Sequence, residues 1–135
     1  MMLNRTLDAV MPGFRQIFRK FGITEQQWRV LRVLSEVPEI PLTELAGVTL
    51  IPAPSLVGVI DRLQTAGLVA RHPAKQDRRV VFVTATLQGR ELLERLLPQV
   101  ANAYATLKQS VAADDWEKLM SGLAAIVEAA QSRAR

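Results

Sequence analysis

The stretch that decides the fold runs from Ala53 to Thr84, with the sequence APSLVGVIDRLQTAGLVARHPAKQDRRVVFVT. Its first part has apolar side chains three or four residues apart, which predicts a helix from Ala53 to Ala66 that Gly67 ends. The periodicity then changes. Leu68–His72 and Val80–Thr84 are β-prone, and the residues between them are polar and turn-prone. We expect a β-hairpin with a long, basic tip.

Helices are predicted on both sides of this stretch. Residues 3–21 have helical apolar spacing, which Pro12 and Gly13 interrupt, so we expect a kink there or a later start. Residues 24–27, Thr-Glu-Gln-Gln, form a capping-box sequence that opens a second helix. The other expected helices are Thr43–Val48, Leu87–Val111 and Asp115–Arg133, the last with Asp114 as its N-cap.

This order of elements predicts the fold class: mainly α with a small β-hairpin wing, that is, a winged helix-turn-helix. A helix of the length of Ala53–Ala66 fits the major groove of B-DNA, which is about 12 Å wide. A hairpin beside it can reach phosphates or the neighbouring minor groove. The order of elements therefore favours binding to double-stranded DNA.

The charge distribution supports the same interpretation. The net charge is +4, and residues 54–90 hold six basic side chains against Asp61 and Asp77, so the whole excess lies in this segment. Localised basicity is typical of a surface that binds a polyanion. A solvated face without a partner is the alternative.

Composition excludes several other functions. The chain of 135 residues has no cysteine and one histidine, which excludes disulfides, thiol chemistry and Cys- or His-rich metal sites. No nucleophile–base pair is evident, so we expect neither an enzyme nor a cofactor. No segment is long and apolar enough to cross a membrane, and we expect a cytoplasmic protein. A mean hydropathy of +0.12 indicates that a partner subunit covers some apolar surface.

Four residues of the helix Ala53–Ala66 are candidates for DNA contact. Pro54 and Ser55 stand in the first turn, where free N–H groups attract phosphate, and Gly58 lets backbone come close to a polyanion. Arg62, one turn further on, could reach the backbone or a base edge. The alternatives are helix packing for Ser55 and Gly58, and for Arg62 an ion pair with Asp61 or Glu44.

The hairpin tip has its own chemistry. Asp77 can hold one of Arg78 and Arg79 in a bidentate pair, which would stiffen the loop, while the other arginine points outward. Narrow minor grooves attract arginine. A merely solvated loop is the alternative.

The residues of this region resemble those of a known family. Residues 67–73 and 77–86, with Gly89, resemble the wing signature of MarR-type transcriptional regulators. Residues 54–57 and 61–63 resemble the recognition helix of that family. Residues 24–30, together with residues 54–55, 58–59 and 62–63, are closest to its branch of homoprotocatechuate-degradation repressors. The resemblance extends from about Leu3 to Ile126.

This resemblance implies a single domain over residues 1–135 that forms a homodimer on a palindromic operator. Residues 3–21 and 87–135 would be dimerisation helices, and residues 24–86 the DNA-binding lobe. Asp77 would brace the wing, and Arg79 would enter the minor groove. The residues expected to contact DNA are Pro54, Ser55, Val57, Gly58, Arg62, Lys75, Arg78 and Arg79.

The resemblance also implies an anionic aromatic ligand between the dimerisation helices and the DNA-binding lobe. Trp28 is the best aromatic candidate, and Arg15, Arg29 and Arg32 are candidate partners for a carboxylate, as is Arg19. Packing of Trp28 in the core and solvation of Arg29 and Arg32 are the alternatives. A ligand-responsive repressor is the leading hypothesis, and a winged helix that binds protein instead of DNA is the second.

Overall fold

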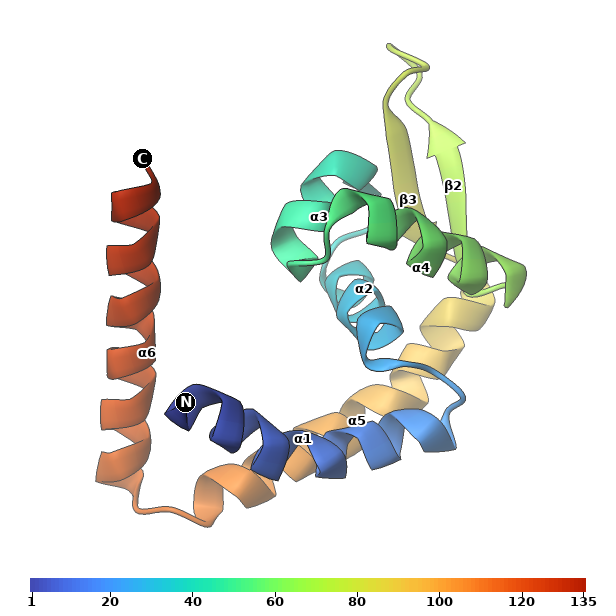
Figure 1. The fold of residues 1–135 in the computed structure, drawn as a ribbon. Helices are drawn as coiled ribbons and strands as arrows, with labels where there is room; N and C mark the ends of the chain where they lie inside the picture. Colours follow the sequence, from blue (N-terminus) through green and yellow to red (C-terminus); the bar gives the residue numbers. More distant parts are fainter. The chain divides into compact units, whose positions relative to one another are not determined.

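The computed structural model describes residues 1–135 as six helices and a three-stranded antiparallel sheet (Figure 1). It confirms the predicted fold class, a mainly helical protein with a winged helix-turn-helix. The helices are α1 (Met2–Lys20), α2 (Glu25–Glu36), α3 (Leu42–Thr49), α4 (Ala53–Thr65), α5 (Leu87–Gln109) and α6 (Ala113–Ala134). The strands are β1 (Ile40–Pro41), β2 (Val69–Pro73) and β3 (Val81–Ala85).

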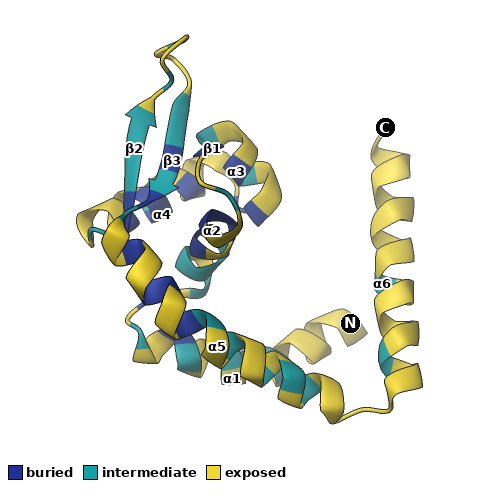
Figure 2. Cartoon of the chain, turned by 180° about the vertical axis from the view of Figure 1, so that it is seen from behind, coloured by how far each residue is buried: buried dark blue, intermediate teal, exposed yellow.

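The chain divides into two compact units, Met1–Val100 and Ala101–Arg135. The first unit contains one hydrophobic core, to which α1 to α5 and the sheet all contribute (Figure 2). In the second unit, the rings of Tyr104 and Trp116 pack edge to face with centroids 5.5 Å apart, and α6 has no buried residue. The core side chains that are most fully enclosed include Phe18, Leu31, Leu45, Leu56, Ile60, Leu63 and Leu96.

The sheet has the strand order β1-β3-β2. In the hairpin, Arg71 of β2 stands opposite Val83 of β3, and Ile40 of β1 pairs with Val83 from the other side. The sequence predicted the hairpin but not β1, because a two-residue strand that includes a proline has no period of its own. The sheet therefore joins the wing to the segment between α2 and α3.

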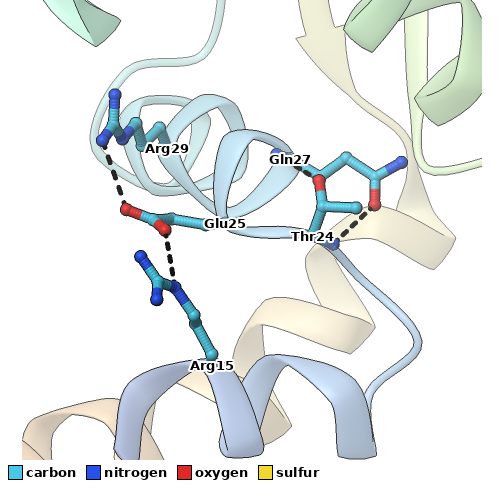
Figure 3. A network of polar contacts seen from close by, with 5 residues as sticks. All are labelled: Arg15, Thr24, Glu25, Gln27 and Arg29. Carbon is cyan, nitrogen blue, oxygen red and sulfur yellow. Dashed lines mark hydrogen bonds and ion pairs between the residues drawn. The ribbon is translucent and has the colours of Figure 1, made fainter. Parts of the chain in front are cut away.

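Helix α1 begins at Met2 and continues through Pro12 without interruption, so the later start that the sequence allowed is wrong. Proline removes one N–H donor from the helical ladder, and α1 continues past it to Lys20. Helix α2 begins as predicted. Thr24 Oγ1 accepts from the Gln27 N–H (3.1 Å), and Gln27 Oε1 accepts from the Thr24 N–H (2.9 Å), which completes the capping box (Figure 3).

The prediction of Asp114 as the N-cap of the last helix is wrong. Helix α6 begins at Ala113, two residues earlier than such a cap implies, and its N-cap is Ala112, which has no side-chain acceptor. Asp114 lies in the first turn and its carboxylate pairs with Lys118 at 2.9 Å. A carboxylate there still stabilises the positive end of the helix dipole, which is why its local sequence resembles a cap.

Close packing fixes the base of the wing. Gly67 ends α4 in the left-handed conformation at φ 77°. The Thr86 hydroxyl donates to the Gly67 carbonyl (2.6 Å) and accepts from the Gly89 N–H (3.0 Å). A Cβ on Gly89 would collide with the carbonyl oxygen of Leu68. Glycine at this position therefore lets the start of α5 approach the start of the wing.

No single helix is long and apolar enough to cross a membrane. By length and composition, α3 and α4 pass such a test only when they are taken together across a 106° bend.

Candidate nucleic-acid interface

Helices α3 and α4 form the helix-turn-helix. They meet at 106° across a break at Leu50, Ile51 and Pro52, which is within the roughly 90–120° of DNA-binding helix-turn-helix motifs. Leu50 adopts the left-handed conformation (φ 58°), a strained one for a residue with a branched side chain, and its side chain is exposed. Ile51 is buried and anchors the turn in the core.

Helix α4 has one buried and one exposed face. The exposed face includes Pro54, Ser55 and Val57, with Gly58 partly exposed beside them, so these predicted residues share the solvent side. No side chain caps the first turn, which leaves its N–H groups available to an anion. The buried residues, which hold the helix on the core, are Leu56, Val59, Ile60 and Leu63.

Arg62 is free for a contact outside the chain. Its guanidinium folds back over Gly58, where a Cβ would lie 3.6 Å from Nη1, an ordinary contact distance. The ion pair with Asp61 or Glu44 that the sequence left open does not form. Asp61 pairs with Arg71 instead.

Arg71 links the recognition helix to the wing. From β2, its Nη2 donates to Asp61 Oδ1 and its Nε donates to Gln64 Oε1 at 2.8 Å. These two acceptors stand three residues apart, on the same side of α4. One planar guanidinium thus fixes the orientation of α4 relative to β2, which sequence reasoning did not predict.

At the wing tip, Asp77 holds Arg79. Asp77 Oδ1 accepts from the backbone N–H of Arg79 (3.0 Å) and from its Nε (3.1 Å), while Oδ2 accepts from Nη2 (3.4 Å). The Arg79 side chain is still 93% exposed. The brace therefore orients this arginine without covering it, and Arg78 and Lys75 are exposed with no ion pair.

The same brace affects the titration of Asp77. The hydrogen bonds from the Arg79 side chain, and then from its backbone, hold the pKa of the Asp77 carboxyl below its ordinary value of 3.8. The carboxylate is charged throughout the neutral range, so the brace is in place wherever the protein would meet DNA.

A cavity of about 620 Å³ lies beside the wing, between the tip and the outer face of the sheet. His72, the single histidine, forms part of its wall. Its Nε2 lies 3.0 Å from Glu39 Oε2, and its ring stacks on Phe82 with centroids 5.8 Å apart. His72 is thus held by contacts within the chain.

The candidate ligand-binding residues come from α1 and α2, and Figure 3 shows two of them, Arg15 and Arg29, on either side of Glu25. Arg15 Nε and Arg29 Nη2 both contact the carboxylate of Glu25, at 3.1 and 3.2 Å. The ring of Trp28 stacks on Phe18 at 5.5 Å and packs against the core. Arg32 is exposed and makes no ion pair.

A cavity of about 470 Å³ opens at the junction of α1 and α2. Two of the predicted ligand residues, Arg15 and Arg19, lie in its wall. Trp28, Arg29 and Arg32 are not part of its lining. Its complete lining is Arg15, Phe18, Arg19, Ile23, Thr24 and Glu25.

The helix-turn-helix, the free arginine on its second helix and the braced basic wing define a winged helix DNA-binding protein. Comparison with known proteins then identifies the family. The MarR family model matches residues 21–80. The homoprotocatechuate degradative operon repressor of Escherichia coli is 32% identical over 97% of this chain and 88% of its own length. The chain therefore belongs to the MarR family of transcriptional regulators.

Solved structures agree with this assignment. NadR in complex with 4-hydroxyphenylacetate is 34% identical, with a TM-score of 0.78 over 92% of this chain and 88% of its own. CouR bound to a 23-mer DNA duplex is 30% identical, with a TM-score of 0.86 over 93% and 89% of the two chains. The protein is thus a DNA-binding transcriptional regulator and not an enzyme, and its likeness to the homoprotocatechuate-repressor branch is confirmed.

Proposed function

We propose that the protein is a cytoplasmic, homodimeric repressor that binds a palindromic operator and leaves it when a small aromatic carboxylate binds. The observation that carries this proposal is the set of unpaired or exposed arginines, Arg62, Arg78 and Arg79, on a winged helix of the family. CouR, a structural relative, is described on a DNA duplex, and NadR with an aromatic acid.

In this proposal α4 enters the major groove of the operator. Ser55, Val57 and Gly58 face base edges, while the uncapped helix start at Pro54 meets a phosphate. Arg62, held over Gly58, supports the contact between helix and DNA.

The wing supplies the second contact. Lys75 and Arg78 meet phosphates, and Arg79, oriented by Asp77, enters the adjacent minor groove, whose negative potential attracts arginine. An arginine that is already oriented loses less conformational entropy on binding than a free one.

The dimer is proposed to form through residues 3–21 and 87–135, with residues 24–86 as the DNA-binding lobe. Leu3 and Leu7 of α1 are more than half exposed. So are Ile126 and Val127 of α6, a helix with no buried residue. Apolar residues on both terminal helices are expected to bury against a second copy. A two-fold axis then places two recognition helices about 34 Å apart, one turn of DNA.

The effector is proposed to bind near Trp28, with Arg15, Arg29 or Arg32 as partner for its carboxylate. In the free protein Glu25 occupies the guanidinium groups of Arg15 and Arg29. A carboxylate ligand would compete with Glu25 for one of them. Release of DNA follows if the ligand prefers a dimer whose recognition helices are wrongly spaced, and a hundredfold loss of affinity needs about 2.7 kcal/mol of coupling.

DNA binding is tested by footprinting and by affinity at several salt concentrations. Inverted half-sites should be protected, and log affinity should fall with log salt at about −0.9 per phosphate contact. Arg79→Ala should weaken binding by about 1–3 kcal/mol, whereas Arg133→Ala, which removes the same charge from α6, should have little effect. An affinity that does not respond to salt would favour a protein-interaction module instead.

The effector is tested by titrating 4-hydroxyphenylacetate and salicylate against the operator complex. We expect one of them to lower operator affinity at millimolar concentration or below. Arg15→Gln, Arg29→Gln and Arg32→Gln are compared, and the residue that binds the carboxylate is the one whose loss abolishes the response but not DNA binding. No response to any aromatic acid would overturn the effector proposal and leave DNA binding intact.

A further inference from the structure

The exposed face of the first half of α4 is almost free of hydrogen-bonding side chains. Its exposed residues there are Ala53, Pro54, Ser55 and Val57, with Gly58 partly exposed. Among them Ser55 alone has a polar side chain. A helix that reads bases by side-chain hydrogen bonds needs donors or acceptors at these positions, and this one has a single hydroxyl.

Most polar side chains in the second half of α4 are already engaged within the chain. Asp61 and Gln64 both accept from the guanidinium of Arg71. The Thr65 hydroxyl donates to the Asp61 carbonyl at 2.9 Å. Arg62 is the remaining free donor group. The α4 groups that remain available to read the base sequence are therefore Ser55, Arg62 and the apolar part of the exposed face.

Val57 is the side chain placed to make that contact. It is 42% exposed, between Leu56 on the buried side and Gly58, which has no side chain to screen it. A β-branched residue in a helix has essentially one χ1 rotamer, so its methyl groups point in a fixed direction. In the major groove, the apolar group that a base presents is the C5-methyl of thymine.

We infer that Val57 is a specificity-determining residue that reads a thymine C5-methyl in each operator half-site. This inference rests on the proposed DNA-binding function and adds the chemistry of the base that is read. Replacing that thymine by deoxyuridine removes one methyl group and leaves the Watson–Crick pairing intact. Because the lost contact is worth about one buried CH₂ group, operator affinity should fall roughly fourfold per half-site, and about sixteenfold when both half-sites are changed.

The experiment combines operator scanning with substitution of Val57. An operator recovered by footprinting is synthesised with deoxyuridine at each thymine in turn, symmetrically in both half-sites, and its affinity for wild type and Val57→Ala is measured. Val48→Ala is the matched control, since Val48 is 49% exposed but lies on α3. Helical content measured by circular dichroism checks that each variant folds.

We expect one symmetric thymine position at which deoxyuridine weakens wild type and Val48→Ala about sixteenfold but leaves Val57→Ala unchanged. Tight operator binding with no sensitive thymine would overturn the inference alone. So would a sensitive thymine that weakens Val57→Ala as much as wild type. If no DNA sequence is bound in preference to another, the inference fails together with the proposed function, and the two failures are thereby distinguished.

Discussion

Residues 1–100 and residues 101–135 differ in how their apolar side chains are covered. Every buried hydrophobic side chain lies between Phe18 and Leu96. Helix α6 is continuous from Ala113 to Ala134 but has no buried residue (Figure 2). Its apolar side chains, among them Leu119, Met120 and Ile126, are exposed. A helix of this kind is seldom stable in water by propensity alone, because most helical stability in proteins comes from packing of an apolar face.

The two units therefore differ in where their stability comes from. The first unit buries its core within one chain, so it presents α4 and the wing on a support that the chain itself provides. The second unit leaves apolar surface that a second copy can cover, and its stability is then tied to association. If the terminal helices form the dimer as proposed, changes in the dimer could alter the spacing of the DNA-binding lobes without disturbing the core of each lobe.

The largest expected effect is on the free energy of unfolding, when one leucine in each unit is shortened to alanine. Leu63→Ala, at a fully buried position, should lower the free energy of unfolding by about 2–5 kcal/mol at every protein concentration. Leu119→Ala, at a position 44% exposed in one chain, should have a cost that varies with concentration. Urea unfolding at two protein concentrations measures both. If the two variants lose the same free energy of unfolding at both protein concentrations, the two units do not differ in this way.

A charge on the apolar face of α6 should separate the subunits. Ile126→Asp places a carboxylate where we expect a second copy to pack, and it should raise the dimer dissociation constant by roughly thirtyfold or more. Ser121→Asp adds the same charge at an exposed polar position of the same helix and serves as the control. Analytical ultracentrifugation measures both variants. If Ile126→Asp remains as dimeric as the control, another surface covers this face.

Helix capping provides a third contrast. The α2 start has a complete capping box, so Thr24→Ala should cost about 1 kcal/mol. The α6 start has Ala112 with no side-chain acceptor, so Ala112→Ser should add stability, again by up to about 1 kcal/mol. Thermal unfolding of the two variants beside wild type tests this, and a stabilising Thr24→Ala or a destabilising Ala112→Ser would contradict it.

Features that depend on neighbouring residues could be predicted from the sequence. The capping box joins Thr24 and Gln27, and the wing brace joins Asp77 and Arg79, so both pairs are visible in a short window. The hairpin followed from a change of period. A short window also has its limit: the local pattern at Asp114 is the same for an N-cap and for a first-turn carboxylate. The structure has the second, with Asp114 paired to Lys118.

Features that depend on distant residues could not be predicted. Arg71 meets Asp61 across ten positions of sequence, and His72 meets Glu39 across thirty-three. Strand β1 exists because Ile40 pairs with Val83, not because of its own two residues. One indirect signal was present for Arg71, since an acidic residue and an amide three positions apart on a solvated helix face form a good acceptor pair for a guanidinium.

The smallest expected effect lies at the exposed edge of the first unit, where burial contributes nothing to the Asp77–Arg79 brace. The hydrogen bonds from Arg79 lower the pKa of Asp77, so any contribution of the brace is complete above pH 3.8 and is lost only as the pH falls through the lowered pKa. A carbon-13 NMR titration of the Asp77 carboxyl should therefore show a midpoint below 3.8 and a constant charge between pH 5 and 8. Arg79→Ala should move that midpoint up toward 3.8, and Arg78→Ala should leave it nearly unchanged. If both substitutions move the midpoint equally, the shift comes from the general positive field of the wing, and Arg79 has no brace to orient it.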